Sequence, residues 1–434
     1  MMNKRSILKV VAVSAAAAFA FGALTACSSG GGSSTPDKKV TLTFWQNSTT
    51  GPGVEFWKTT VANFEKANKN ITINMQSIQN EDLDGKLQTA LNSGSAPDIF
   101  LQRGGGKMAA MVKAAQLMDL TGLITAKTKA AVGAGAFAAD QYNGKSYAMP
   151  VDVLPEGIYY SKNMFKAAGI SDTPTTMNEL NSDIAKLKAS GVAAVAVGAK
   201  DAWPAAHWYY NFALRECSES VLNEAAKTLK FTDGCWLKAG KDVDTFNKSQ
   251  PFNDGFLTTA AQQGAGSSAG LVANHKAAME LMGAWDPGVI ASLTPDQKPL
   301  PDLGWFPFPS VSGGKGDPAA MMGGVDGYSC SAQAPKAACA AFMNYIVTTP
   351  VQEAYYKAFD APPVNTAAQS VVTEDILKSV LAAYKKAPYV SQYLDTNYGQ
   401  NVGNALNSGV VNILAGKGTP ADVLTDVSSA AAKG

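Results

Sequence analysis

Apolar residues recur with two different spacings from residue 40 onward, one typical of strands and one typical of helices. Apolar and polar residues alternate over 40–45, whereas Phe56, Trp57 and Phe64 lie at near-helical intervals within 54–67. The same two patterns predict further strands at 71–75 and 98–101 and a helix at 82–92. Because strands and helices alternate at this spacing, we expect right-handed βαβ units and an open, doubly wound sheet in an α/β fold.

A second unit of the same kind begins near Pro150. The pattern predicts a strand at 156–160, a helix at 177–190 and a buried strand at 192–197, and the tail beyond Lys336 is mostly helical. Without its first 27 residues the 434-residue chain keeps about 407, which is too many for one ordinary core and suits two lobes.

The first 26 residues have the layout of a signal peptide. Lys4, Arg5 and Lys9 precede an Ala-rich apolar run at 10–24, which is too short to span a membrane. The run ends in Leu-Thr-Ala-Cys27, which looks like a bacterial lipobox, so we predict a lipid on Cys27; an ordinary secretory signal is the alternative. Gly and Ser dominate the predicted linker at 27–37. We therefore expect an exported protein held at the outer face of the cell membrane by lipid alone.

Charge and cysteine content narrow the partners. The 36 basic and 35 acidic residues are well mixed and leave a net charge of +1. The sequence has no basic stripe of the kind that binds a nucleic acid, so we expect a neutral ligand. Cys217, Cys235, Cys330 and Cys339 allow three pairings, of which 217 with 235 and 330 with 339 is the simplest. Only two histidines are present and Cys-x-x-Cys is absent, so we expect no metal and no cofactor.

Polar tripeptides follow directly after three of the predicted strands. In open α/β sheets, ligands bind beyond the carboxyl ends of the strands. This rule places Asn47, Asn80 and Arg103 at a ligand crevice, and Asp152 just after the expected passage into the second unit.

Several short blocks carry a resemblance to a known family. They are Ser93-Gly-Ser-Ala-Pro-Asp98, Tyr142-Asn-Gly-Lys-Ser-Tyr-Ala-Met-Pro150, Gly157-Ile-Tyr-Tyr-Ser-Lys-Asn163, Lys276-Ala-Ala-Met279 with Gly283-Ala-Trp285, and Ala361-Pro-Pro-Val-Asn365. In order and spacing these blocks resemble the extracellular solute-binding proteins of bacterial ABC importers, specifically the large carbohydrate-binding group.

The resemblance implies a periplasmic-binding-protein-like fold, with two α/β lobes joined by hinge strands and a sugar held between them. It suggests lobe one at about 38–150 plus 275–328 and lobe two at about 151–274 plus 329–434. Such a protein acts as a monomer, closes around its ligand and docks on the permease subunits in the membrane.

A sugar presents hydroxyls at its edges and C–H patches on its faces, so its site needs an aromatic platform and fork-like polar groups. Aromatic and polar residues that stand side by side at the ends of elements are therefore the candidates. They are Trp285 with Asp286, Asp326 with Tyr328, His207 with Trp208, and Tyr393 with Asp395.

No catalytic residue is expected. The segment 266–270 matches the hydrolase motif Gly-x-Ser-x-Gly, but the polar, loose sequence before Ser268 is not the strand that the motif requires. The sequence therefore predicts reversible capture of a short oligosaccharide, with an α-linked galactoside or glucoside such as raffinose or panose as the specific candidate. A surface glycosidase is the alternative, and paired carboxylates among 35 acids do not decide between the two without geometry.

Overall fold

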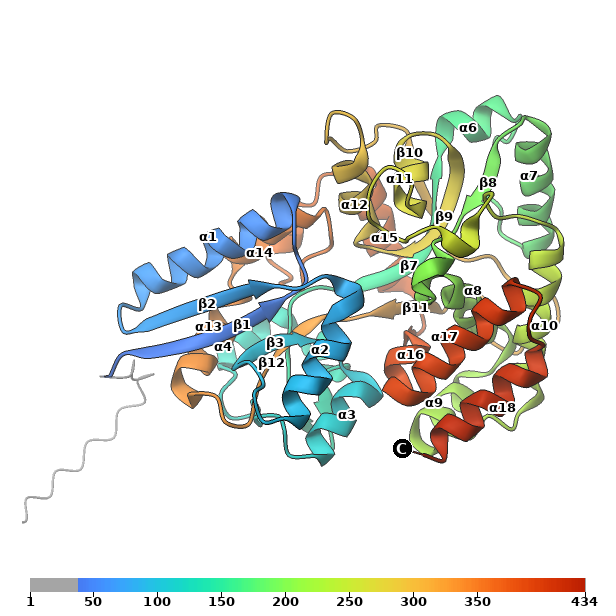
Figure 1. Cartoon of the computed structure of the whole chain (residues 1–434). Helices are drawn as coiled ribbons and strands as arrows, with labels where there is room; N and C mark the ends of the chain where they lie inside the picture. The colour runs from blue at the N-terminus through green and yellow to red at the C-terminus, as the bar shows by residue number, and fades with distance from the viewer. Residues whose placement is uncertain (1–37, 434) are drawn as a thin grey trace, which may run out of the picture. The chain divides into compact units, whose positions relative to one another are not determined.

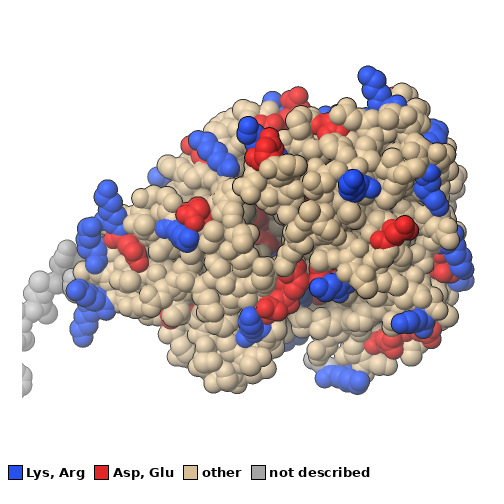
Figure 2. Space-filling model, turned by 45° about the horizontal axis from the view of Figure 1, so that its top comes forward, with Lys and Arg blue, Asp and Glu red and all other residues tan. Residues whose placement is uncertain are grey.

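The computed structural model describes residues 38–433, and the predicted signal peptide, Cys27 and linker lie outside them. Two β-sheets organise this part of the chain, and helices flank both, which confirms the α/β prediction (Figure 1). Basic and acidic side chains are mixed over the face drawn in Figure 2. Within the described residues, no helix combines the length and the apolar character that a membrane span needs.

The first sheet has the strand order β2-β1-β3-β12-β6. Its strands are β1 (Val40–Gln46), β2 (Ile71–Ser77), β3 (Ile99–Gln102), β6 (Met149–Pro150) and β12 (Gly327–Cys330). β1 pairs in parallel with β2 and β3, whereas β12 is antiparallel to β3 and β6. The parallel register brings the carboxyl ends of β1, β2 and β3 to one edge of the sheet.

Helices pack on both faces of the first sheet. One face carries α1 (Gly51–Ala67), α13 (Lys336–Ile346) and α14 (Thr349–Phe359), and the other carries α2 (Asn80–Asn92) and α3 (Gly105–Lys113). Phe44 of β1 lies at the centre of the first interface, where its ring meets Trp57, Tyr328 and Phe342 edge-on. Burial of each such ring contributes roughly 1.5–3 kcal/mol, which fixes the sheet against α1 and α13.

The second sheet is built around one central strand. Its strands are β7 (Leu154–Ser161), β8 (Ala193–Ala196), β9 (Ala277–Gly283), β10 (Leu303–Phe306), β11 (Met321–Gly324) and β13 (Val390–Gln392). β7 pairs antiparallel with β9 on one side and with β10 and β11 on the other. β8 and β13 extend the sheet by parallel pairing with β9 and β11.

The larger core of the molecule lies on one face of the second sheet. The helices that contribute to it are α6 (Lys162–Ala167), α7 (Met177–Ala189), α8 (Trp203–Glu216), α9 (Glu219–Thr228), α10 (Gly234–Lys248), α16 (Leu394–Asn397), α17 (Gln400–Leu414) and α18 (Pro420–Ala431). The opposite face packs against α11 (Ser268–Ala273) and α12 (Asp286–Leu293). Every residue of α8 after Trp203 is buried, so this helix runs through the interior.

The remaining elements are short or peripheral. They are α4 (Ala126–Val132), α5 (Ala134–Ala138), the hairpin of β4 (Gln141–Tyr142) and β5 (Lys145–Ser146), α15 (Asp375–Lys386), and three 3-10 turns at Ala199–Asp201, Phe256–Thr258 and Ala368–Val371.

The predicted helices and strands up to residue 197 are confirmed, with ends shifted by a few residues. The helix predicted at 177–190 is α7, and its start is fixed by a capping box in which the Thr176 hydroxyl accepts from the Glu179 N–H. The strand predicted at 192–197 is β8. It pairs with β9, and Ala194 and Val195 contribute to the core of the second sheet.

The assignment of residues 275–328 to the first lobe is wrong for most of that segment. β9, β10 and β11 all belong to the second sheet, because each of them pairs with β7. Conversely α13 and α14, which were expected in lobe two, pack in the core of the first sheet. A hydrophobic pattern marks a strand as buried but does not say which neighbour it pairs with. The points at which the chain crosses from one sheet to the other could therefore not be obtained from the pattern.

Two of the segments that connect the sheets are bonded to each other. The chain leaves the first sheet after β6 through residues 151–153 and returns from β11 to β12 through Val325 and Asp326. The Val151 N–H donates to the Asp326 carbonyl at 2.9 Å, and the Asp326 N–H donates to Asp152 Oδ1 at 3.1 Å. These paired segments form the connection about which the halves could turn.

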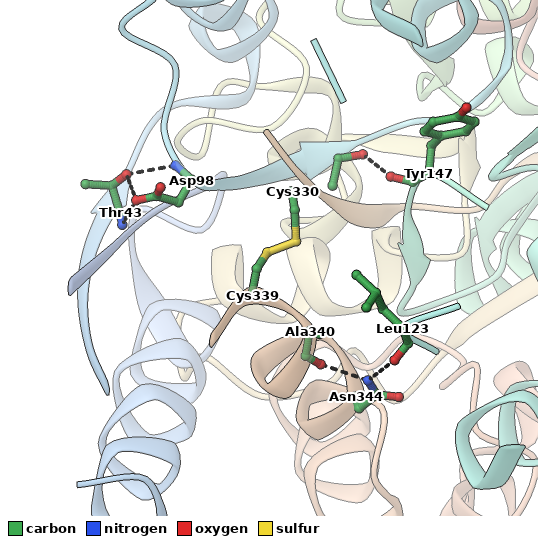
Figure 3. Close-up of a disulfide and its surroundings, with 9 residues drawn as sticks. Thr43, Asp98, Leu123, Tyr147, Cys330, Cys339, Ala340 and Asn344 are labelled. Atoms are coloured by element: carbon green, nitrogen blue, oxygen red, sulfur yellow. Dashed lines mark hydrogen bonds between the residues drawn. A yellow bond between two sulfur atoms is a disulfide. The ribbon is translucent and has the colours of Figure 1, made fainter. Parts of the chain in front are cut away.

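Both predicted disulfides are present in the structure. Cys217 at the end of α8 is bonded to Cys235 of α10, and Cys330 of β12 is bonded to Cys339 of α13. Figure 3 shows the second bond between strand and helix, with Asn344 donating to the carbonyls of Leu123 and Ala340 nearby. Disulfides of this kind typically stabilise the fold by about 2–4 kcal/mol each.

Candidate ligand-binding cleft

Arg103 organises the first side of the cleft. It follows β3, and its Nη2 donates to Asn80 Oδ1 at 2.6 Å at the start of α2. Asn47, after β1, donates to the same oxygen at 3.4 Å. Arg103 also faces Asp84 and Asp326, each at 3.5 Å, and its side chain is 21 % exposed. The crevice rule thus brought Asn47, Asn80 and Arg103 to one edge of the sheet, as the sequence predicted.

Three acidic groups, Asp84, Asp326 and Asp395, hold the Arg103 guanidinium in its ionised form. Burial opposes ionisation of Asp84, but the charges of Arg103 and Lys107 outweigh it and lower the pKa of Asp84 to about 2. Burial also acts to lower the pKa of Arg103, and Asp84, Asp326 and Asp395 raise it well above its usual value. Lys107 donates to Asp84 at 2.8 Å. The result is a fixed cation whose planar donors suit paired hydroxyl or carbonyl oxygens.

Aromatic rings form the second side of the cleft. Trp285 lies with its ring centroid 6.0 Å from that of Trp203 and 5.9 Å from that of Tyr393. His207 stacks on Tyr393 at 4.7 Å with an interplanar angle of 13°. The Trp203 and Trp285 side chains are half-buried, whereas His207 is 3 % exposed and lies behind Tyr393. The rings therefore present an apolar surface with a polar second layer.

That second layer is anchored on Glu156 of β7. One carboxylate oxygen is bonded to His207 Nδ1, and the other accepts from Asn211 Nδ2 at 2.6 Å. Tyr393 is fixed independently, because its hydroxyl donates to the Leu154 carbonyl at 3.0 Å. These bonds fix the rings of His207 and Tyr393 before any ligand arrives.

The two sides approach each other closely. Gln392 of β13 donates to the Arg103 carbonyl at 2.5 Å, and the half-buried Asp395 of α16 acts on the Arg103 charge. A Cβ atom at Gly106 of α3 would lie 2.6 Å from the Asn397 carbonyl oxygen of α16. Figure 2 shows a hollow near the middle of its face, with acidic side chains inside it and beside it.

Asp152 lies at the connection between the sheets rather than on the cleft surface. It is 3 % exposed and accepts from the Tyr355 hydroxyl and the Asp326 N–H. Burial and the neighbouring Asp326 raise its pKa well above the usual range. Asp140 beside it is fully buried, and neither of its carboxylate oxygens has a hydrogen-bond partner within the described part of the chain. The structure thus places Asp152 among the connecting segments, where its carboxylate is already bonded within the protein, and its role toward a ligand stays a prediction.

Three other predicted ligand residues are buried in the interior. Trp208 (1 % exposed) stacks on Phe246 in the second core, and Tyr328 (2 % exposed) packs on Phe44 in the first. Asp286 is fully buried beside Glu280. All three were predicted to bind the ligand because of an aromatic or acidic neighbour, and adjacent residues on a strand or helix point in different directions.

The sequence reasoning missed four residues of the cleft. Asp84 lies one helical turn beyond the predicted Asn80 on α2, and this spacing of four could have indicated it, whereas Lys107 lies on α3, which begins after Arg103. Trp203 begins α8, next to the predicted His207, and Glu156 was read only as part of a strand. Among residues 38–433, no group of three or more His, Cys, Asp or Glu side chains is arranged to hold a metal ion.

The sequence and the fold place this chain in one family. Residues 47–353 match the family described as bacterial extracellular solute-binding proteins, and the chain belongs to it. Its members bind solutes rather than transform them, which agrees with the prediction that the chain is not an enzyme.

Curated relatives match over different lengths. A putative binding protein of Brucella abortus is 28 % identical over 178 residues, which is 41 % of this chain but only 43 % of that relative's length. A multiple sugar-binding protein of Streptococcus mutans is 26 % identical over 348 residues, 78 % of each chain.

Solved structures share the fold over nearly the whole chain. A chitin oligosaccharide binding protein superposes with a TM-score of 0.83 at 22 % identity, over 91 % of this chain and 98 % of that one. A structure from a study of xylan utilization by Caldanaerobius polysaccharolyticus has a TM-score of 0.82 at 25 % identity, over 90 % and 99 %. The two-lobed fold of the resemblance is thereby confirmed.

Proposed function

We propose that this chain is the sugar-binding subunit of an ABC importer, which captures a short oligosaccharide between its two lobes and delivers it to the permease subunits. The observation that carries the proposal is the pairing of two surfaces across the cleft. The fork-like Arg103 lies on one side and the rings of Trp203, Trp285 and Tyr393 on the other. Family membership and the name of the Streptococcus mutans relative support it.

The two surfaces have complementary roles toward a sugar. The faces of sugar rings carry C–H groups that pack on aromatic rings, so Trp285 would act as the platform. Arg103, Asn80, Asn47 and Asp326 would bind hydroxyls, where charged partners strengthen the hydrogen bonds. Asp395 faces them from α16. Closure is favoured only to the extent that the sugar binds the closed form more tightly than the open form.

The specific ligand that we propose is an α-linked galactoside or glucoside such as raffinose or panose. This choice rests on the resemblance to oligosaccharide binders. A binding protein solved in complex with raffinose shares this fold with a TM-score of 0.71, but at 19 % identity it supports the fold alone.

We further propose that the protein works as a monomer anchored at the outer face of the cell membrane. The support is the lipobox-like Leu-Thr-Ala-Cys27 and the family's extracellular character. Cys27→Ala in a host that processes lipoproteins should move the protein from the membrane fraction to the soluble fraction. Unchanged membrane association of that variant would contradict the lipid anchor.

The test of the function is calorimetric titration with raffinose, panose, xylo-oligosaccharides and chito-oligosaccharides, followed by recovery of each sugar. Saturable binding of an intact sugar supports the importer subunit and identifies the substrate class. Cleaved sugar would indicate the glycosidase alternative, and absence of binding across the panel would contradict the assignment to carbohydrate.

A further inference from the structure

The carboxyl groups of Glu280 and Asp286 lie within interaction distance of one another beside the second sheet, next to the aromatic side of the cleft. Glu280 is on β9, where it pairs with Tyr159 of β7, and Asp286 is the first residue of α12. Both side chains have an exposed fraction of 0 %. In the sequence they enclose the stretch 281–285, which ends in Trp285.

Neither carboxyl group accepts a hydrogen bond from any donor among residues 38–433. All four oxygens are buried without a partner. The neighbouring hydroxyl of Ser268 on α11 donates instead to the Ala261 carbonyl at 2.9 Å. Two ionised carboxylates in such a place would be strongly unfavourable, since their burial keeps them from bulk solvent and no Lys or Arg of residues 38–433 is bonded to them. A proton on one carboxyl would supply the missing hydrogen bond to the other.

Among residues 38–433, no Lys or Arg is bonded to either carboxyl. β7 contributes Tyr159, whose hydroxyl is also buried without a partner, and Glu156, which is bound on its far side by His207 and Asn211 of α8.

Two further elements pack against the pair's own segments. β8, which pairs with β9, has no titratable residue. α14 packs on α12 and carries Glu353 and Lys357, but neither of these charges shifts the pKa of Glu280 or Asp286. Burial raises the pKa of both carboxyls above the usual range, and Asp286 adds to the rise at Glu280.

The pair is linked directly to the aromatic platform. Trp285 precedes Asp286, and its ring lies so close over Gly283 that a Cβ there would meet ring atom Cε3 at 2.6 Å. Separation of β9 from the start of α12 would therefore move Trp285 relative to Trp203 and Tyr393. Two like charges at Glu280 and Asp286 would favour that separation.

We propose that Glu280 and Asp286 keep at least one shared proton at neutral pH, and that the hydrogen bond between them positions Trp285 for the ligand. They are positioning residues, because neither reaches the cleft surface and both act through Trp285. The inference rests on the proposed function only for the identity of the ligand, since the proton and the place of Trp285 can be observed without one.

The proton is tested first, by infrared spectroscopy of the sugar-free protein at neutral pH. A protonated carboxyl gives a carbonyl band that shifts in D2O. We expect Glu280→Gln to remove part of this band, whereas Asp375→Asn, a change at an exposed carboxylate, leaves it intact. An identical band in wild type and Glu280→Gln would overturn the shared proton.

The positioning role is tested by titrating raffinose between about pH 6 and about pH 10. We expect wild-type affinity to fall about tenfold on the alkaline side, the equivalent of one pK unit, as the last proton leaves. Glu280→Gln keeps a donor at every pH, so its affinity should equal that of the wild type at neutral pH and stay constant above it. Coincident pH profiles of the two proteins would overturn the role.

A sugar-free readout separates this inference from the proposed function. The pH dependence of tryptophan fluorescence should be present in wild type and lost in both Glu280→Gln and Trp285→Phe. If raffinose fails to bind but this pattern is found, the ligand assignment fails and the positioning role stands. If raffinose binds and the pattern is absent, the positioning role fails and the function stands.

Discussion

The two sides of the cleft differ in their chemistry, because one consists of paired charges and the other of aromatic rings. On the first side each charge has a partner, since Arg103, Lys107, Asp84 and Asp326 neutralise one another within 3.5 Å. On the second side the rings lie next to the buried acids Glu156, Glu280 and Asp286, none of which is paired with a Lys or Arg of residues 38–433. Under the proposed function, we expect the first side to select the pattern of hydroxyls and the second to supply contact area. Substitutions on the two sides should therefore have different signatures.

Loss of the platform should have the largest effect. Trp285→Ala should weaken sugar binding by about 2–4 kcal/mol, the range of a buried aromatic anchor, as measured by calorimetry. Trp285→Phe serves as the graded control and should lose less, because it keeps a ring. Full-strength binding by a folded Trp285→Ala protein would remove this residue from the site.

Loss of the planar Arg103 donors should have the second-largest effect on affinity and should change the selectivity among sugars. Arg103→Lys keeps the charge but not the planar donors, so we expect a loss of about 1.5–3 kcal/mol for the preferred sugar. Poor sugars in the panel should lose less, which flattens the ranking. A uniform loss across the panel would show that Arg103 contributes charge alone.

A smaller effect is expected where the sides touch. A Cβ at Gly106 would meet the Asn397 carbonyl oxygen at 2.6 Å and the Gly399 nitrogen at 2.7 Å, so Gly106→Ala should disfavour closure. We expect affinity to fall by about 1 kcal/mol, the usual size of a coupling between conformations. Small-angle scattering should show less compaction with sugar than in wild type.

Gly85→Ala is the matched control for that variant. Gly85 lies on α2, and a Cβ there meets no atom within 4 Å. Wild-type compaction in both variants would contradict a role of the α3–α16 contact in closure.

The smallest effect concerns acid stability. The folded pKa of Asp84 is depressed to about 2, so its contribution is present above the unfolded value of about 4 and is lost as pH falls toward 2. Asp84→Asn should flatten the decline of the thermal midpoint across this window. Asp82→Asn, at an exposed position of the same helix, should not. Parallel declines in the wild type and Asp84→Asn would contradict the assignment.

The sequence predicted the first side of the cleft far better than the second. The carboxyl-end rule found Asn47, Asn80 and Arg103 because parallel strands bring consecutive loops to one edge. The second side is assembled from β7, α8, α12 and β13, which are distant in sequence and come together only by packing. Trp208 and His207 are adjacent on α8, yet one enters the core and the other backs the cleft, and no local signal separates them.

The two ends of the described chain lie in different halves of the molecule, and this offers a way to measure closure directly. β1, the first described strand, lies in the first sheet, whereas α18, the last helix, packs in the core of the second. A donor dye near Lys38 and an acceptor near Lys433 would therefore ride on opposite halves. Energy transfer between them would convert closure into an optical signal, and a single molecule could then report each capture and release of its sugar in real time.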